Sequence, residues 1–394
     1  MQKRFYKRLT LKKRHGVKIL HFSDTHLGFS DLETLNDENI NQREADFYDA
    51  FAQVVAKIKE IRPDYIIHTG DLFHRASPSN RAIAFALEQF KIINDLKIPF
   101  ILIAGNHSTP RTNLSAPILQ IFENFENVYV AYKQKYEKIE FADALFHALP
   151  HMNDETQALS QIELCEAALA DGKKNILMMH CSVGAHYLMA EFGEWVFPRE
   201  KEAIFTKMDY VALGHWHGFG KVGKHENVYY SGSTERTSLN DKRNTKGFIL
   251  LTLGGDTLFD AWHVEFCPIK IRPVIQKEID AKEYENSLSL LDTSDTQDAI
   301  VEVRLVNLTP LQSIEIQNAE IKKLFPHAMN VSIKREFIHD GGTASYTDDV
   351  ATLSLEEVFL EHLKEQSQES EFARLKEKTQ ELFAAYEETN DDTL

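Results

Sequence analysis

Five short clusters of polar residues occur in this 394-residue chain, and each directly follows an apolar run that is typical of a β-strand. In chain order the clusters are Asp24-x-His26, Gly70-Asp71, Gly105-Asn106-His107, His180 and Gly214-His215-x-His217. Together they supply two carboxylates, one amide oxygen and several imidazoles, which are ligand types for neighbouring divalent metal ions. Two ions about 3.5–4 Å apart can hold both the attacking and the leaving oxygen of a phosphoryl displacement. The pattern therefore predicts a phosphoester-cleaving enzyme.

The order of the clusters suggests how two metal sites would divide the ligands. One carboxylate should bridge the ions, and we expect Asp71 in this role because it lies centrally in the ligand order. The other ligands are expected to divide into Asp24, His26 and His217 for one ion and Asn106, His180 and His215 for the other. Nitrogen and oxygen ligands without thiolate favour Mn, Fe or Zn over Ca or Mg. A Gly-Asp pair or a lone histidine is common by chance, so the prediction depends on all five clusters together.

Among the other histidines and cysteines, one residue is expected to donate a proton and the rest are interpreted as structural. A leaving alkoxide needs a proton, and His107, next to Asn106, is the expected general acid. Cys181 is interpreted as a small buried apolar residue. The histidines without the support of a cluster are interpreted as structural, and these are His21, His68, His151, His186 and His263.

An alternation of strands and helices is expected to position the clusters. The spacing of apolar residues predicts strands at 17–23, 65–67, 99–103, 176–179 and 210–213 and helices at 43–61 and about 80–96. The βαβ alternation at the start of the chain is typical of an α/β fold. In open α/β sheets, ligands gather beyond the carboxyl ends of strands, which is where the clusters fall.

The rest of the chain predicts several separate parts. These are a basic leader over 1–16, a catalytic domain over 17–267, a smaller α+β domain over 268–337, a linker over 338–352 and an acidic helical tail over 353–394. Short apolar runs at 226–230, 247–253 and 258–266 predict that the catalytic domain finishes as a β meander. In the smaller domain we expect strands at 299–306 and 329–337 and one helix near 311–325.

The distribution of charge is more informative than the net charge of −16. Residues 355–394 contain twelve acidic and four basic residues, whereas the first 20 residues contain eight basic residues and no acid. The basic leader could follow a phosphate backbone, or it could be a solvated arm without a partner. The overall acidity therefore does not exclude a nucleic-acid partner.

Three scattered cysteines and the absence of long apolar runs indicate the class of protein. Cys165, Cys181 and Cys267 form no CxxC pair, which fits a reducing compartment. No apolar run approaches the roughly 18 residues that span a bilayer, and the basic start lacks the apolar region of a signal peptide. We expect a soluble cytoplasmic protein with no membrane association.

The five clusters resemble the signature of the calcineurin-like metallophosphoesterases. Within that superfamily, the sequences Ser23-Asp24-Thr25-His26-Leu27-Gly28 and Gly70-Asp71-Leu72-Phe73-His74 are similar to those of the SbcD-type (Mre-eleven) DNA-repair nucleases. A third match is Tyr230-Ser231-Gly232-Ser233-Thr234-Glu235-Arg236-Thr237-Ser238, with Lys246-Gly247-Phe248 after it. The resemblance covers about residues 17–267 and continues weakly into the smaller domain.

This resemblance implies a fold and an activity. The implied fold is an α/β β-sandwich flanked by helices, with a smaller DNA-capping domain and a C-terminal helical tail. The implied activity is that of a manganese-dependent nuclease, an exonuclease on double-stranded DNA ends and an endonuclease on single strands and hairpins. His74 matches a family histidine that helps to place the scissile phosphate, so the resemblance implies a catalytic role for it.

The resemblance also implies partners. Family members form homodimers and work with an SbcC-type (Rad-fifty-like) ATPase, which a C-terminal helical segment grips. In this chain the candidate segment is an apolar stripe of Phe372, Leu375, Leu382, Phe383 and Tyr386. The alternative is that this stripe packs on its own domain.

One residue departs from the family pattern. The family usually has Gly-Asn-His-Asp, whereas this chain has Ser108 after His107. A carboxylate next to His107 could orient or charge it, and a serine does so poorly. The serine therefore keeps open a non-catalytic scaffold that recruits an ATPase to DNA. A phosphodiesterase or phosphatase for small molecules also stays open, because the core of the superfamily does not fix the substrate.

Overall fold

The computed structural model describes residues 16–110, 116–188, 194–238, 241, 245–254 and 262–338, together with the single positions 376 and 379. It divides into two compact units, each of which is described by itself. The first unit comprises Met1–Ile275, Ser294–Val301 and His327–Asn330, and the second comprises Gln276–Thr293, Glu302–Pro326 and Val331–Leu394. No helix within the described ranges is long and apolar enough to cross a membrane.

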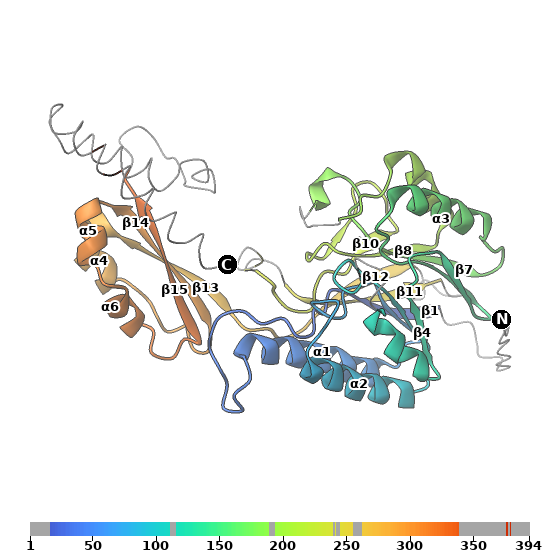
Figure 1. Cartoon of the computed structure of the whole chain (residues 1–394), viewed down its shortest axis with the longest axis horizontal. Helices are drawn as coiled ribbons and strands as arrows, with labels where there is room; N and C mark the ends of the chain where they lie inside the picture. The colour runs from blue at the N-terminus through green and yellow to red at the C-terminus, as the bar shows by residue number, and fades with distance from the viewer. Residues whose placement is uncertain are drawn as a thin grey trace. The chain divides into compact units, whose positions relative to one another are not determined.

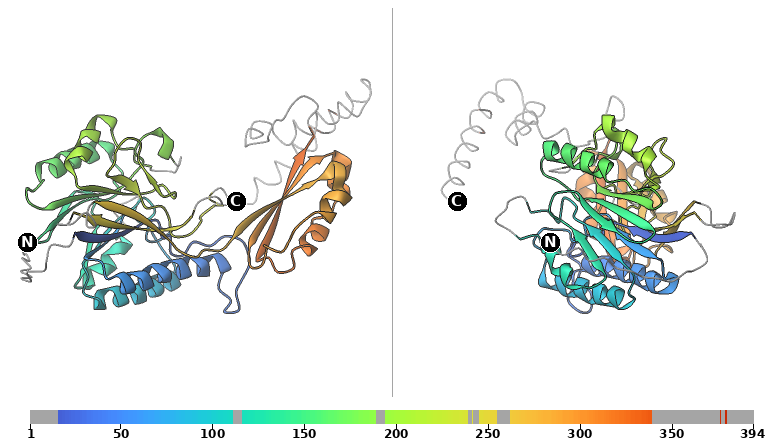
Figure 2. Two further views of the ribbon diagram at one scale, coloured as in Figure 1. Left: turned by 180° about the vertical axis from the view of Figure 1, so that it is seen from behind. Right: turned by 90° about the vertical axis from the view of Figure 1, so that its right-hand side faces the viewer.

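A sandwich of two six-stranded sheets forms the first unit (Figure 1 and Figure 2). The first sheet has the order β12-β11-β1-β2-β3-β4, with β1 (Val17–Phe22), β2 (Tyr65–His68), β3 (Phe100–Ile103), β4 (Val128–Ala131), β11 (Gly247–Leu253) and β12 (His263–Pro268). The second has the order β5-β6-β7-β8-β10-β9, with β5 (Glu137–Glu140), β6 (Ala144–Leu149), β7 (Lys174–His180), β8 (Tyr210–Gly214), β9 (Gly220–Lys221) and β10 (Val228–Tyr230). The expected α/β fold with a helix-flanked β-sandwich is confirmed.

Helices cover the outer faces of both sheets (Figure 1). Helices α1 (Gln42–Ile61), α2 (Asn80–Asp95) and the 3₁₀ helix η1 (Ile118–Asn124) pack on the first sheet, and α3 (Glu155–Ala167) and η3 (Arg199–Lys207) pack on the second. A further 3₁₀ turn, η2, spans Ala185–Tyr187. The Asn41 side chain accepts hydrogen bonds from two backbone amides at the start of α1, and the Ser79 side chain accepts one from Ala82 N at the start of α2. The left-handed backbone of Arg62, with φ 53°, ends α1 before Pro63.

Alternating side chains on the strands build three layers of core. On β2, Ile67 points into the layer between the two sheets, whereas Ile66 points toward α1 and α2. The layer between the sheets is made of fully buried residues from both, including Ile19, Ile101, Phe146, Ile176 and Ala212. Since strand residues alternate between faces, every central strand contributes to two layers, which fixes its register.

The parallel central strands bring the polar clusters to one edge of the sandwich. In the first sheet Phe22 pairs with His68, and His68 pairs with Leu102 on β3. In the second sheet His180, the last residue of β7, pairs with Gly214, the last residue of β8. The carboxyl ends of these strands are therefore level within each sheet, and the loops that follow them carry the candidate ligands.

The expected β meander at the end of the first domain is wrong. Strand β10 lies in the second sheet between β8 and β9, whereas β11 and β12 belong to the first sheet, where β11 pairs antiparallel with β1. The chain crosses from one sheet to the other because Ile249 and Leu251 fill the layer between the sheets from the side of the first sheet. Hydrophobic runs alone do not specify which sheet a strand joins.

The second unit contains a three-stranded sheet in the order β13-β14-β15 (Figure 2). Its elements are β13 (Val274–Asp280), η6 (Ala281–Glu283), α4 (Tyr284–Ser289), β14 (Ile300–Leu308), α5 (Pro310–Glu315), α6 (Asn318–Lys323) and β15 (Asn330–Phe337). The strands expected at 299–306 and 329–337 are present as β14 and β15. The single helix expected near 311–325 is wrong, since Ile316 and Gln317 are extended and separate α5 from α6. This extended pair lets the apolar Ile316 side chain be buried.

Three of the expected parts fall mostly beyond the described residues. The basic leader at 1–16 is described at Gly16 alone, and the linker at 338–352 at Ile338 alone. The acidic tail at 353–394 is described at positions 376 and 379 alone. These segments therefore remain predictions from the sequence.

Candidate metal centre

The candidate ligands lie in tight turns directly after the central strands. Positive φ angles occur at Asp24 (51°), His26 (40°), Asp71 (54°) and His215 (95°). Residues with a Cβ adopt this conformation at an energetic cost, which the surrounding structure must offset. Backbone hydrogen bonds hold the turns together, from Asp24 N to Gly70 O (3.0 Å) and from His26 N to Asp71 O (3.0 Å).

Three glycines allow the turns to approach each other closely. A Cβ atom at Gly70 would lie 2.2 Å from His180 Nδ1, and one at Gly105 would lie 2.2 Å from Asp71 Oδ1. A Cβ at Gly214 would lie 2.1 Å from the carbonyl oxygen of Thr69. These distances are far below van der Waals contact, so each position excludes a side chain. The glycine that precedes a ligand thus makes room for a ligand from another strand.

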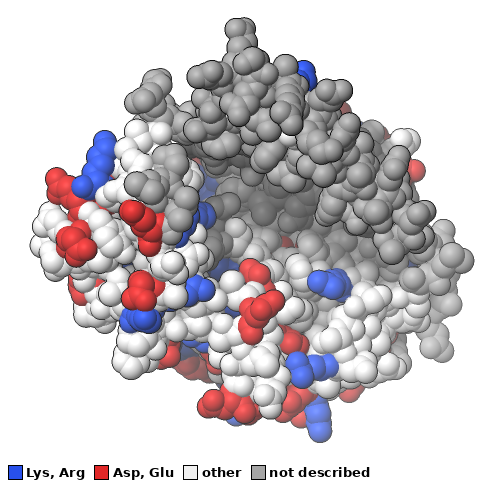
Figure 3. All heavy atoms as spheres, turned by 60° about the vertical axis from the view of Figure 1, so that its left-hand side comes forward, with Lys and Arg blue, Asp and Glu red and all other residues white. Residues whose placement is uncertain are grey.

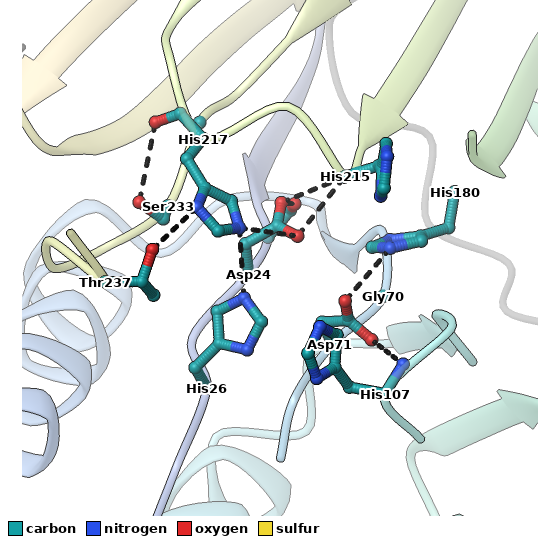
Figure 4. Close-up of polar contacts among 12 residues, drawn as sticks. Asp24, His26, Gly70, Asp71, His107, His180, His215, His217, Ser233 and Thr237 are labelled. Carbon is teal, nitrogen blue, oxygen red and sulfur yellow. Dashed lines mark hydrogen bonds and ion pairs between the residues drawn. The ribbon is translucent and has the colours of Figure 1, made fainter. Parts of the chain in front are cut away.

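One group of candidate ligands consists of Asp24, His26 and His217 (Figure 4). Their donor atoms lie within 4.8 Å of one another, and all three residues are buried. The two Nε2 atoms of His26 and His217 are 3.1 Å apart, and His217 Nε2 is 4.0 Å from Asp24 Oδ1. The structure therefore brings together the three ligands predicted for one ion.

A second group forms around Asp71 and His180 (Figure 4). His180 Nε2 lies 3.1 Å from Asp71 Oδ2 and 2.9 Å from Asn106 Oδ1. Its other ring nitrogen, Nδ1, donates a hydrogen bond to the carbonyl oxygen of Thr69 at 2.8 Å. This bond turns Nε2 toward the two oxygens, as an outer hydrogen bond commonly does for a metal-binding histidine.

The carboxylates connect the two groups. Asp24 belongs to the first group, and it also lies within 4.8 Å of the donor atoms of Asp71 and His180. The Asp24 carboxylate accepts a hydrogen bond from Ser23 Oγ. The backbone N–H of His215 is shared between the two carboxylate oxygens, each 3.2 Å from His215 N. Both carboxylates therefore lie close enough to the boundary between the groups to take part in bridging, and the bridging role of Asp71 stays a prediction.

His215 lies beside the second group. Its ring centroid is 5.4 Å from that of His180, and its Nε2 atom is 3.1 Å from Glu194 Oε1. Its backbone amide is the part that contacts Asp24. Glu194 has no counterpart in the sequence prediction, since no polar cluster at a strand end surrounds it.

The donor atoms of both groups fit divalent cations. His180 Nδ1 already donates to Thr69 O, so Nε2 of the neutral ring carries no proton. Nε2 nevertheless faces two oxygens, Asp71 Oδ2 and Asn106 Oδ1. A proton or a metal ion is therefore needed among these three atoms. In the first group, two buried imidazole nitrogens face each other beside a carboxylate, and His26 Nδ1 has no hydrogen-bond partner among the described residues. Nitrogen and oxygen donors without thiolate suit first-row divalent metals.

The pKa shifts of Asp24 and His180 also indicate that the centre needs a positive charge. Burial raises the pKa of Asp24, and the neighbouring Asp71 carboxylate raises it further. Burial lowers the pKa of His180, but the two carboxylates of Asp71 and Asp24 and the hydrogen bond to Thr69 together outweigh that effect, and the pKa of His180 rises. A buried pair of carboxylates is thus stabilised by whatever positive charge lies between them, whether a proton or a metal ion.

His107 and His74 lie at the edge of the first group. The rings of His26, His74 and His107 offer donor atoms within 4.8 Å of one another, and the rings of His74 and His107 stack with centroids 5.3 Å apart. His107 N donates to Asp71 Oδ1 at 3.0 Å, and His107 Nδ1 donates to the carbonyl oxygen of His74 at 2.8 Å. The backbone of His74 therefore sets the tautomer of the neutral His107 ring.

The contacts of His107 show what the serine at position 108, in place of the family aspartate, changes. The Ser108 side chain is fully buried, and its Oγ has no hydrogen-bond partner among the described residues. The neighbouring Thr109 Oγ1 donates to the carbonyl oxygen of Gly105 at 2.8 Å, which closes the turn. Orientation of His107 comes from the His74 carbonyl, so it does not depend on a carboxylate at position 108.

Two of the histidines interpreted as structural have clear structural contacts. His21 bonds to Tyr210 Oη and Thr69 Oγ1, each at 3.0 Å, and His68 Nε2 lies 3.2 Å from Thr25 Oγ1. Burial lowers the pKa of both histidines to about 3, so both are neutral in the folded protein. Cys181 is buried, as predicted.

Sequence reasoning missed the residues that contact the far side of His217. Thr237 Oγ1 is 2.9 Å from His217 Nδ1, and Lys246 Nζ donates to the His217 carbonyl oxygen at 2.7 Å. Both residues occur in the third family-like motif, which the sequence analysis recognised without assigning a role to any of its residues. The resemblance of that motif to the family sequence was the signal that could have identified them.

Comparison with known proteins shows which family the chain belongs to. The profile described as calcineurin-like phosphoesterase matches residues 17–219, just over half of the chain, and includes every candidate ligand. The protein described as DNA double-strand break repair protein Mre11 from Methanocaldococcus jannaschii is 27% identical over 286 residues, which are 70% of this chain and 73% of that protein.

Two further proteins with the same description are similar over comparable or longer stretches. That of Thermoplasma acidophilum is 30% identical over 287 residues, covering 68% of this chain and 70% of its own length. That of Methanococcus maripaludis is 26% identical over 371 residues, covering 90% of this chain and 93% of its own length. The chain therefore belongs to the calcineurin-like phosphoesterase family, in its Mre11 (SbcD-like) branch, and is a metal-dependent phosphoesterase.

Proposed function

We propose that the protein is the nuclease subunit of a DNA double-strand-break repair or end-processing system. One observation carries the proposal: candidate ligands that follow five strand ends of two sheets lie in two groups, and Asp24 has donor atoms within 4.8 Å of both. The relatives described as DNA double-strand break repair proteins support DNA as the substrate. The finer activity that we propose is 3′–5′ exonuclease cleavage of double strands and endonuclease cleavage of single strands and hairpins.

Two divalent ions are proposed to be held by Asp24, His26 and His217 on one side and by Asn106, His180 and His215 on the other, with Asp71 between them. Bound there, such ions would neutralise phosphate charge and lower the pKa of the attacking water, and Mn²⁺ is the proposed ion. The buried carboxylates supply the negative charge that holds the ions in place. The positive φ angles and the glycine turns fix these ligands before substrate binds.

His107 is proposed to protonate the leaving oxygen. Its Nδ1 hydrogen is committed to the His74 carbonyl, so Nε2 is the atom that would carry the transferred proton. The stacked His74 ring lies against the same region and is proposed to place the scissile phosphate. Because His107 N also donates to Asp71 Oδ1, the proton donor and a metal ligand are held by one turn.

The partners belong to the same proposal. We propose that the α+β domain at 268–337 caps DNA, that the protein forms a homodimer, and that the tail at 353–394 binds an SbcC-type ATPase. A cytoplasmic location is proposed as well, and the three free cysteines fit its reducing conditions.

A phosphodiesterase or phosphatase for small molecules is the alternative enzyme. The second unit, with a three-stranded sheet of its own, argues against it because a small substrate does not need it. A scaffold without catalysis is a third function, and the complete ligand set argues against that one.

A comparison of substrates tests the proposal. With Mn²⁺ present, the purified protein should cleave duplex ends and hairpins, and should act far less on cyclic nucleotides and aryl phosphodiesters. A preference for the small substrates would favour the alternative enzyme. DNA binding without metal-dependent cleavage of any substrate, even with the ATPase present, would favour the scaffold.

A further inference from the structure

Several side chains from the segment between β10 and β11 converge on the face of His217 that points away from the other ligands (Figure 4). Thr237 Oγ1 lies 2.9 Å from His217 Nδ1, and Asp241 Oδ2 lies 4.0 Å from the same atom. Ser233 N donates to the His217 carbonyl oxygen at 3.1 Å. The ring and the backbone of this one ligand are thus both held by the same segment.

Lys246 is the charged residue of this arrangement. Its side chain is fully buried, and its Nζ donates to the His217 carbonyl oxygen at 2.7 Å and to Ser233 Oγ at 2.8 Å. It also lies 3.5 Å from Asp241 Oδ2. Burial of an ammonium group is costly unless it is paired and hydrogen-bonded, and here each partner is either His217 itself or a residue that contacts His217.

These contacts are made to His217, a ligand of the first group alone. A hydrogen bond at Nδ1 fixes the ring of His217 so that Nε2 points toward His26 and Asp24. In the second group, the corresponding support comes from elsewhere: His180 Nδ1 donates to Thr69 O, and Asp71 Oδ1 accepts from His107 N.

We propose that Lys246 and Thr237 are positioning residues of His217, and that they set the affinity of the ion held by Asp24, His26 and His217 while leaving the other ion unaffected. The proposal rests on the proposed two-metal site. It assigns a role to the segment 231–246, which contributes no predicted ligand of its own.

A titration with Mn²⁺, followed by the electron paramagnetic resonance signal of the free ion, counts the sites and gives their affinities without any substrate. Lys246→Met removes the donor, and Thr237→Val removes the hydroxyl at nearly constant shape. Thr237→Ser is the conservative variant that keeps the hydroxyl. Lys174→Met is the matched control, because Lys174 pairs with Asp209 at 2.9 Å and begins the strand that ends at His180.

The expected result is a loss of affinity at one of two sites by about 10- to 100-fold in Lys246→Met and in Thr237→Val. Thr237→Ser and Lys174→Met should bind both ions as the wild type does. Two unchanged sites in the first two variants, or equal weakening of both sites, would overturn the proposal. If Lys246→Met does not fold, the Val and Ser variants at Thr237 decide the question alone.

The outcome also separates this inference from the proposed function. Wild-type protein that takes up no Mn²⁺ would overturn the two-metal site and the inference together. Wild-type protein that binds two ions, combined with unchanged binding in the variants, would overturn the inference and leave the proposed function standing.

Discussion

At the scale of single residues, the centre depends on positions where a side chain would not fit. Gly70, Gly105 and Gly214 each place backbone where a ligand from another strand must pass. Asp71 beside Gly70 and His215 beside Gly214 have unfavourable positive φ angles, which the packed turns maintain. The geometry of the metal groups is therefore set by small residues as much as by the ligands themselves.

Gly105→Ala should impair the centre without unfolding the protein. The new Cβ would meet Asp71 Oδ1 at 2.2 Å and displace this carboxylate. A shift of about 1 Å at a reacting group can cost about 100-fold in rate, and we expect a loss of that order in turnover. Gly220→Ala is the control, because a Cβ there meets nothing within 4 Å. Equal activity of the two variants would show that Asp71 is not constrained in this way.

His107→Ala should separate metal binding from catalysis. His107 supplies no predicted ligand atom, so Mn²⁺ binding should persist, whereas loss of a general acid typically lowers the rate by about 10²- to 10⁴-fold. Turnover and metal content measured on the same preparation provide the test. A wild-type rate in this variant would remove His107 as the general acid.

At the scale of elements, His21 on β1 joins the two sheets through Tyr210 on β8. Its folded pKa of about 3 lies below its ordinary value of 6.5, because burial and then the nearby His68 disfavour the charged form. The unfolded chain takes up this proton below about pH 6.5, and the folded protein does not. The free energy of unfolding should therefore fall between pH 6.5 and pH 3, by about 1.4 kcal/mol per pH unit for this residue.

Denaturant unfolding at several pH values tests this prediction. His21→Gln keeps a polar group between the sheets and removes the titration, so its free energy of unfolding should fall less steeply with acid than that of the wild type. His68, whose pKa is also about 3, should maintain part of the slope in the variant. Identical slopes for the two proteins would contradict the assignment of His21 as a neutral buried residue.

Sequence periodicity predicted the elements that carry the site better than their arrangement. Helix α1 was expected at 43–61 and is found at Gln42–Ile61, since its apolar face and the Asn41 cap are local signals. The placement of β11 beside β1 depends on long-range packing between the sheets, so the sequence suggested a meander instead. Likewise, the contacts of Thr237 and Lys246 with His217 join residues far apart in the sequence, which no periodicity predicts.

At the scale of the whole molecule, the acidic net charge raises the question of how DNA would be held. On the face drawn in Figure 3, the Lys and Arg side chains of the described residues are interspersed with Asp and Glu, and neither sign forms a continuous patch. Under the proposed function, the divalent ions in the centre would supply the concentrated positive charge that such a surface lacks.

Deletion of residues 353–394 tests whether the tail binds the ATPase while the rest of the chain cleaves DNA. The apolar stripe in this tail is the predicted ATPase-binding segment, so the shortened protein should lose association with an SbcC-type ATPase. It should still cleave single-stranded DNA, because every candidate ligand lies within residues 24–217. Co-elution with the ATPase and cleavage of a labelled strand are the two measurements. Unchanged association would place the contact elsewhere.

The most direct test of the central claim is cleavage of an end-labelled DNA hairpin with added Mn²⁺ by the wild type and by Asp71→Ala. The wild type should cut the hairpin only when Mn²⁺ is present, and the variant should lose bound metal and cleavage together, because Asp71 is the proposed bridge between the two ions. A variant that keeps both ions and cuts at the wild-type rate would contradict the two-metal account of this centre.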